Sequence, residues 1–229
     1  MKSKNTLPEL IVKKKLSEMG LSYKCHIKNL DGTPDIVIEK FKIIINVKGC
    51  FWHNHGCIEN KLPTSKINFW ANKFNSVKIS DNENLIIGRI FNVYGPNQKE
   101  NFLVPTILNQ IKNKNNSIEL GNLSDIRDYL YVTDVVHALK ILAEQRINPP
   151  KKDIFNIGSG VGINATEIAN QLMDISKAKK NIVSIKSRKR FDENPYEVAN
   201  SLKLRSLGWK PKVNLSEGLT KCITASVKL

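Results

Sequence analysis

The chain has 229 residues, a hydrophobic content of 41%, four cysteines and a formal net charge of +15. This length allows one large domain or two small ones, and no apolar run reaches the roughly 18 residues that a membrane helix needs. No apolar segment follows the first lysines as in a secretory signal, and so few cysteines favour a reducing compartment. We therefore expect a cytoplasmic protein without a membrane partner. The positive charge favours polyanions, although a composition rich in Lys and Asn can also reflect codon bias.

The first predicted element is a helix that begins after Thr6 and ends at Gly20. Thr6 can cap this helix, and Glu9 follows three residues later, as in a capping box. Apolar residues recur along one face, and glycine is typical of a helix C-terminus. The lysines at positions 13–15 are expected to be solvated. A short strand over residues 23–27 could follow.

Residues 35–38 and 42–47 form a predicted antiparallel hairpin. The start of one strand then lies beside the end of the other, so Asp35 is expected close to Lys48. A carboxylate at this position is a candidate ligand for Mg²⁺, and a neighbouring His would complete a site for metal-assisted phosphodiester cleavage. The alternative for Asp35 alone is a turn residue that follows Pro34.

Two cysteines and two histidines lie within residues 50–57. Cys50, His55 and Cys57 have the residue types and spacing to offer three ligands to one Zn²⁺. Such a metal would fix the loop and leave His53 and the neighbouring Trp52 to face a partner. The alternative is a pair of reduced core cysteines with two surface histidines.

Later in the chain, residues 84–96 are predicted to form one strand that stops at a Gly-Pro pair. A short helix is expected over residues 104–111. Residues 125–134 should form a strand that turns into a helix, which continues over residues 135–144 with apolar residues at helical spacing.

A further strand is predicted over residues 154–157, followed by a glycine-rich loop and a helix. Asn164 and Glu167 have the spacing of a capping box at the start of that helix. The loop does not match a dinucleotide fingerprint, which needs a different glycine spacing and an acid about 20 residues later. The chain instead carries Lys179 and Lys180 in that later region.

Four segments resemble, in order and spacing, the very-short-patch-repair DNA mismatch endonucleases. They are residues 5–9, 32–37, 49–57 and 69–74. The resemblance covers residues 5 to about 76 and implies a truncated restriction-endonuclease-like α/β unit that acts on DNA.

The same resemblance implies roles for particular residues. Asp35 would bind Mg²⁺, His53 would be the catalytic base, and Glu9 would support the site, unless Glu9 is only the capping acid. Structural Zn²⁺ would be held by the three ligands named above. Phe51, Trp52 and Trp70 would wedge into DNA beside a T·G mismatch, although Trp52 and Trp70 could instead be core residues.

The chain departs from this family in two respects. Lys48 stands where a His, Asn or Asp is usual, and a Lys could contact the DNA phosphate there. The family's fourth zinc ligand follows later in its sequence and has no counterpart here. Cys25 and Cys222 are the remaining cysteines, and neither has a matching context.

Four further segments resemble the C-terminal half of the NAD-dependent nucleotide-sugar epimerases and dehydratases, the extended short-chain dehydrogenases. They are residues 89–96, residues 127–136, residues 155–160, and residues 207–211 followed by 217–219. The resemblance implies an α/β fold, the C-terminal part of a Rossmann-type enzyme.

In this second family Asn92 and the segment 102–106 would face the nucleotide-sugar. Arg127 or Arg190 would pair with its diphosphate, a task that suits a guanidinium. For Arg127 the alternative is a salt bridge to a neighbouring acid. The family's cofactor loop and Tyr-x-x-x-Lys pair precede the matched motifs, and no Tyr in this chain has a Lys four residues later. NAD binding and hydride transfer are therefore not expected.

The sequence thus predicts two incomplete parts, residues 1–76 and residues 77–229. Three hypotheses follow. The first part could be a Mg²⁺-dependent DNA endonuclease, the second could bind a nucleotide-sugar without turnover, or the whole chain could be an inactive chimera.

Overall fold

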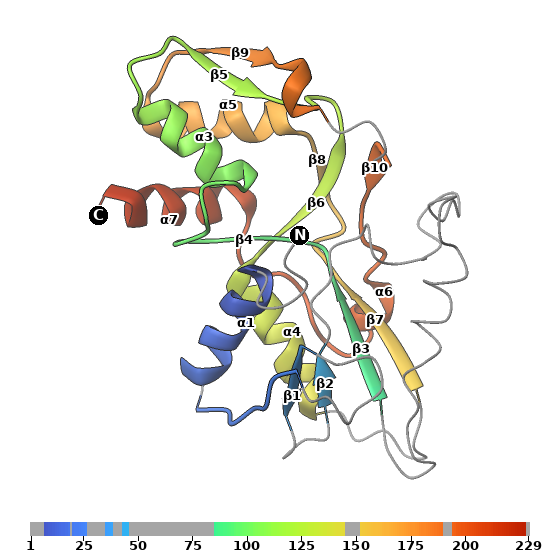
Figure 1. The fold of residues 1–229 in the computed structure, drawn as a ribbon. Helices are drawn as coiled ribbons and strands as arrows, with labels where there is room; N and C mark the ends of the chain where they lie inside the picture. Colours follow the sequence, from blue (N-terminus) through green and yellow to red (C-terminus); the bar gives the residue numbers. More distant parts are fainter. Residues whose placement is uncertain are drawn as a thin grey trace. The chain divides into compact units, whose positions relative to one another are not determined.

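The computed structural model describes residues 7–18, 20–26, 35–38, 43–45, 85–144, 152–189 and 194–227. These residues form a mixed α/β structure, drawn in Figure 1, that divides into two compact units. The first unit comprises Met1–Phe91, Val135–Ile157 and Asn200–Lys210. The second unit comprises Asn92–Asp134, Gly158–Ala199 and Pro211–Leu229.

Helix α1, Leu7–Glu18, confirms the first predicted helix. Gly20, two residues beyond this helix, has a φ of 70°, in the left-handed region. The N–H of Gly20 donates to the carbonyl of Ser17 at 2.9 Å, and that of Leu21 donates to the carbonyl of Leu16 at 3.0 Å. This pair of hydrogen bonds is a Schellman motif, which explains why a glycine ends the helix.

The expected solvation of the lysines at 13–15 is wrong for Lys13. Lys13 is buried, with 7% of its surface exposed, whereas Lys14 is exposed. The ammonium of Lys13 lies 3.4 Å from Nε2 of His26, at hydrogen-bond distance. A buried ammonium needs polar partners, and the run of three lysines gave no sign of which one would have them.

Strands β1, Ile36–Ile38, and β2, Ile43–Ile45, confirm the predicted hairpin. They are antiparallel, and Ile36 pairs with Ile45. The short strand expected over residues 23–27 is reduced, within residues 20–26, to an isolated bridge between Lys24 and Val37.

The first unit also contains a parallel pair of strands, β3, Leu85–Ile90, and β7, Lys152–Ile157. Most of helix α4, Val132–Glu144, and helix α6, Leu202–Arg205, belong to the same unit. The α6 residue Lys203 forms an ion pair with Asp153 and lies 4.6 Å from the ring centroid of Phe155. Helix α6 is therefore fixed to strand β7.

The single strand predicted over residues 84–96 is wrong, because the chain forms two strands there. Strand β3 ends at Ile90, and β4, Asn92–Tyr94, begins after Phe91. The two strands have different partners, β7 for β3 and β6 for β4. An uninterrupted apolar run shows that strands are present, but it does not show where the chain changes partner.

The second unit is built around strand β6, Ile126–Tyr131. Strand β6 lies parallel to β4 on one side and to β10, Tyr196–Glu197, on the other. It also pairs antiparallel with β8, Gly162–Ile163. The strand predicted within residues 125–134 is therefore confirmed, and α4 follows it directly.

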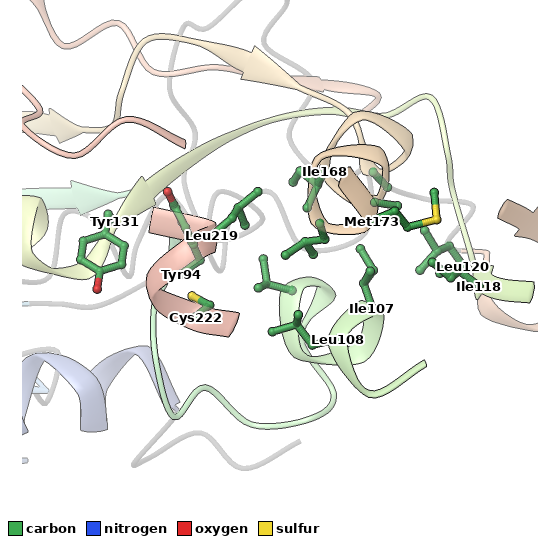
Figure 2. Close-up of a cluster of buried hydrophobic side chains, with 14 residues drawn as sticks. Tyr94, Ile107, Leu108, Ile118, Leu120, Tyr131, Ile168, Met173, Leu219 and Cys222 are labelled. Atoms are coloured by element: carbon green, nitrogen blue, oxygen red, sulfur yellow. The ribbon is translucent and has the colours of Figure 1, made fainter. Parts of the chain in front are cut away.

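The hydrophobic core of the second unit lies among three helices, α3, Leu103–Lys112, α5, Ala165–Ser176, and α7, Leu215–Val227. Figure 2 shows their buried side chains packing together, with Ile118 and Leu120 contributed by β5. Strand β5, Ser117–Leu120, is parallel to β9, Asn181–Ser184, and the 3₁₀ helix η3, Lys186–Arg188, follows.

The predicted capping box of α5 is confirmed. The side chain of Asn164 accepts a hydrogen bond from the N–H of Glu167 at 2.9 Å, and Glu167 accepts one from the N–H of Asn164 at 2.8 Å. Each helix within the described residues falls short of the length and apolar character that crossing a membrane requires.

Candidate functional site

The carboxylate of Asp128 on β6 accepts four hydrogen bonds. Its surface is 0% exposed. Oδ1 accepts from the N–H and from the hydroxyl of Ser159, each at 2.7 Å. Oδ2 accepts from the N–H of Gly160 at 2.8 Å and from that of Ala199 at 3.1 Å. A buried carboxylate with four donors is well compensated for its loss of water.

The N–H groups of the glycine-rich loop therefore bind a side chain of the protein itself, the carboxylate of Asp128. Gly160 has a φ of 77°, and successive N–H groups point at one carboxylate, in the manner of an anion-binding nest. A Cβ at Gly158 would lie 2.7 Å from Oδ2 of Asp128, so the loop packs too closely for a side chain there. Because Asp128 already takes these N–H donors, the loop does not fit the pyrophosphate of a dinucleotide.

Asn92, a predicted substrate-binding residue, lies beside Asp128. It begins β4 and pairs with Tyr129 of β6. Its Nδ2 donates to the backbone carbonyl of Asp128 at 3.3 Å. The register of β4 against β6 thus fixes the position of the Asn92 amide.

Arg127 is the residue before Asp128, and its guanidinium is held by acids from two segments. It lies 3.4 Å from Oδ2 of Asp125 and 3.7 Å from Oε2 of Glu197. It also donates to the carbonyl of Ile126 at 3.0 Å. Its side chain is 12% exposed. The salt bridge considered from the sequence is therefore present, and Arg190 lies outside the described residues.

The segment 102–106, also predicted to face the nucleotide-sugar, forms the start of α3. Thr106 donates its hydroxyl to the carbonyl of Glu100 at 2.7 Å, which ties the first turn to the preceding loop. Val104 is buried in the core with 2% of its surface exposed. At least this residue of the segment therefore has a packing role.

A tyrosine and a lysine also meet in space in the second unit. The ammonium of Lys221 lies 5.4 Å from the ring centroid of Tyr131. Burial raises the pKa of Tyr131, which disfavours the phenolate. Lys221 is held by Glu217 at 2.7 Å, a contact that raises the pKa of Lys221. The raised pKa of Tyr131 keeps its phenol protonated near neutral pH, and the raised pKa of Lys221 keeps its ammonium charged.

In the first unit, Asp35 stands at the start of β1, opposite the end of β2, and is 8% exposed. Glu9 lies in α1. The other predicted endonuclease residues lie outside the described residues: Lys48, Cys50, Phe51, Trp52, His53, His55, Cys57 and Trp70. Within the described ranges, no group of three or more His, Cys, Asp or Glu side chains could hold a metal ion.

Both cysteines considered as a fourth zinc ligand are free thiols in the structure, Cys25 exposed and Cys222 buried. Burial raises the pKa of Cys222 to about 12. Zinc binds the thiolate, so the surroundings of Cys222 oppose this role.

Sequence reasoning missed Asp128 and Ser159 as structural residues of the site. Both lie inside segments that carry the second resemblance. The available signal was an acid in the middle of a buried strand, which requires donors from elsewhere in the fold.

Two family models match the chain. The model for the DNA mismatch endonuclease Vsr matches residues 1–59, and the model for GDP-mannose 4,6 dehydratase matches residues 72–222. The two matches occupy separate stretches, as the two sequence resemblances did.

Curated relatives divide in the same way. Type II nicking enzyme V.XorIIP of Xanthomonas oryzae is 41% identical over 81 residues, which is 35% of this chain and 60% of that enzyme. CDP-abequose synthase of Salmonella typhimurium is 28% identical over 139 residues, 59% of this chain and 46% of that enzyme. The chain thus spans about half the length of these relatives.

Solved structures show the fold. RMD from Pseudomonas aeruginosa, complexed with NADPH, has a TM-score of 0.66 at 21% identity and covers 82% of this chain and 67% of that chain. UDP-glucose 4-epimerase from Thermotoga maritima, solved with UDP-glucose, has a TM-score of 0.56 at 28% identity. The match covers 71% of this chain and 50% of the epimerase chain.

These findings confirm that an endonuclease-like segment is joined to a nucleotide-sugar epimerase/dehydratase-like segment, and that both are partial. Since the second family model matches more than half of the residues, the chain belongs to the GDP-mannose 4,6 dehydratase family and carries an N-terminal segment similar to the mismatch endonuclease Vsr.

Proposed function

We propose that residues 85–229 bind a nucleotide-sugar and do not convert it. The observation that carries this proposal is the placement of Asn92 and Arg127 around Asp128. Asn92 donates to the carbonyl of Asp128, and Arg127 is the adjacent residue of the same strand. An amide and a guanidinium thus adjoin the same residue of β6, one through a hydrogen bond to its backbone carbonyl and the other through the chain.

The ion pairs of Arg127 are compatible with diphosphate binding. Its contacts to Asp125 and Glu197, at 3.4 and 3.7 Å, are longer than the ~2.8 Å of a strong charge-assisted hydrogen bond. The likeness to a UDP-glucose 4-epimerase solved with UDP-glucose, at 28% identity, supports this class of ligand.

Absence of turnover follows from the residues of this chain. The printed sequence has no Tyr with a Lys four residues later, and the loop at residues 158–160 donates to Asp128. We therefore propose no role in proton transfer or NAD binding for the described residues of the second unit.

Calorimetry with UDP-glucose and GDP-mannose tests the proposal on the full chain. We expect saturable heat that is lost in Arg127→Ala and kept in Arg188→Ala, because Arg188 pairs with Glu119 at an exposed position. Heat that is absent with both sugars, or equal in the two variants, would contradict the proposal. Chromatography of the sugar after incubation with NAD should show no product.

A second candidate function is Mg²⁺-dependent nicking of DNA by residues 1–76. It is favoured by the position of Asp35 at the start of β1, opposite the end of β2, where a carboxylate could hold Mg²⁺. When bound, Mg²⁺ would polarise the phosphate. His53 as base, Glu9 as support, Zn²⁺ on the cysteine-histidine run and the aromatic wedge remain predictions, as does the boundary at residue 76.

The nicking test uses a T·G-mismatched duplex with Mg²⁺. We expect cutting by the unmodified chain and none by Asp35→Ala. Ser22→Ala, at an exposed position of the same unit, is the matched control. Equal cutting by Asp35→Ala would end this candidate.

A further inference from the structure

The first unit draws its elements from both parts of the chain. Helix α1 and strands β1 and β2 come from the endonuclease-like segment, whereas β3 and β7 come from the dehydratase-like segment. The endonuclease match ends at residue 59 and the dehydratase match begins at residue 72. Both positions lie inside the first compact unit.

Strand β1 of the hairpin is buried on both faces. Ile36, Val37 and Ile38 are 0%, 6% and 2% exposed. Successive side chains of a strand point to opposite faces, so apolar residues are buried on both sides of β1. An isolated two-stranded hairpin is marginally stable in water and cannot supply this cover. Further parts of the first unit must therefore pack on it.

Strand β3 of the dehydratase-like segment offers an apolar surface on which the hairpin can pack. It is hydrogen-bonded to β7 in a parallel pair, and Ile86 and Ile90 are 5% and 2% exposed. Parallel strands are normally found inside larger sheets with both faces covered. An uncovered strand edge is an aggregation hazard. A pair of parallel strands alone would leave such edges.

These two surfaces lie together. Strand β2 runs beside β3, as Figure 1 shows, with Cα atoms within 8 Å. Among the described residues of the first unit, the strand ladders are β1 with β2 and β3 with β7, and no ladder joins β2 to β3. The two strands are therefore neighbours in space that belong to different sheets.

We infer that the β1–β2 hairpin of the endonuclease-like segment covers the β3 side of the dehydratase-like sheet, so that the two segments fold as one cooperative unit. In Figure 1 the hairpin lies beside β3, on the side away from β7. The junction thus creates an internal interface, and neither partial segment forms the first unit alone. This inference is independent of nucleotide-sugar binding, which concerns the second unit.

Hydrogen exchange of the full chain under increasing urea tests the inference without any substitution. Cooperative units lose protection together. We expect the amides of residues 36–38, 86–90 and 154–157 to exchange through one shared opening with the same urea dependence. Separate openings, with the hairpin exchanging at lower urea than β3 and β7, would overturn the inference.

A pair of variants gives a second test. Val37→Asp places a charge in the buried hairpin, whereas Ser22→Asp places it at an exposed position of the same unit. We expect Val37→Asp to raise exchange at Ile86 and Ile90 by at least about tenfold, which corresponds to about 1.4 kcal/mol, and Ser22→Asp to leave it unchanged. The amides of α5 in the second unit serve as an internal reference. Unchanged exchange of the β3 amides in Val37→Asp would contradict the inference. If exchange of the α5 amides also rises, the variant has lost stability throughout, and the urea dependence of the unmodified chain then decides whether the hairpin and β3 open together.

Discussion

Ser159 donates two hydrogen bonds to one oxygen of Asp128, from its backbone N–H and from its hydroxyl, each at 2.7 Å. This contact ties the loop after β7 to the middle of β6. Because Asp128 is completely buried, the donors replace all of its water. Arg127 precedes Asp128 on β6, and the Asn92 amide donates to the backbone carbonyl of Asp128.

Replacing Asp128 tests this arrangement. Asp128→Asn should lower the free energy of unfolding by about 2–4 kcal/mol, because the new amide would direct its own N–H groups at buried N–H donors. Urea unfolding followed by circular dichroism measures the loss. Asp174→Asn, at an exposed position of α5, is the matched control and should change stability by less than about 0.5 kcal/mol. Equal stability of the two variants would show that the buried carboxylate is not required.

Arg127→Lys separates charge from geometry. Lysine keeps the charge but lacks the planar fork that binds two phosphate oxygens. We expect about a tenfold loss of nucleotide-sugar affinity by calorimetry. The control is Arg188→Lys, which alters the exposed pair with Glu119 and should leave the affinity unchanged. If Arg127→Lys binds as tightly as the unmodified chain, the guanidinium is not a diphosphate ligand.

Alkaline pH should weaken the second unit. Burial raises the pKa of the Cys222 thiol from 9.0 to about 12, and it also raises the pKa of Tyr94. A raised pKa means that the folded state keeps protons that the unfolded state releases. The resulting stabilisation is complete below about pH 9 and is lost as the pH rises towards 12. Urea unfolding at several pH values should therefore show a falling free energy of unfolding above about pH 9, and a constant value would contradict this.

The same burial makes a prediction about thiol reactivity. Native Cys222 should react far more slowly with iodoacetamide than the exposed Cys25, because the thiolate is the reactive form. Peptide-resolved mass spectrometry distinguishes the two sites, and labelling in urea provides the fully reactive reference. Equal native rates at the two cysteines would show that Cys222 is accessible.

Metal content tests the prediction from the cysteine-histidine run. We expect near-stoichiometric zinc in the purified chain by plasma mass spectrometry, and loss of that zinc in Cys57→Ser. Cys25→Ser is the matched control and should retain the metal, since Cys25 is a free exposed thiol. Zinc-free protein, or equal zinc in both variants, would contradict the zinc prediction.

Local signals made much of the fold predictable. The capping box of Asn164 and Glu167 and the glycine that ends α1 act within a few residues, so their spacing in the sequence is enough. The β1–β2 hairpin was likewise indicated by two short apolar runs with a turn between them. In these cases the residues that form an element also determine where it begins or ends.

Features that depend on distant partners were not predictable. Ala199 donates to Asp128 across 71 positions in the sequence, and no local pattern connects them. The break between β3 and β4 was missed because their partners, β7 and β6, lie elsewhere in the chain. Burial of Lys13 was missed because its contact with His26 arises only after α1 has ended and the chain has turned back.

Hydrogen exchange with and without UDP-glucose tests the central claim most directly, because it asks whether a nucleotide-sugar contacts the strands around Asp128. The account expects added protection at residues 92–94 and 126–131 in the presence of the ligand, and no such change in Arg127→Ala. Identical exchange of these strands at saturating UDP-glucose and at saturating GDP-mannose would contradict nucleotide-sugar binding by the second unit.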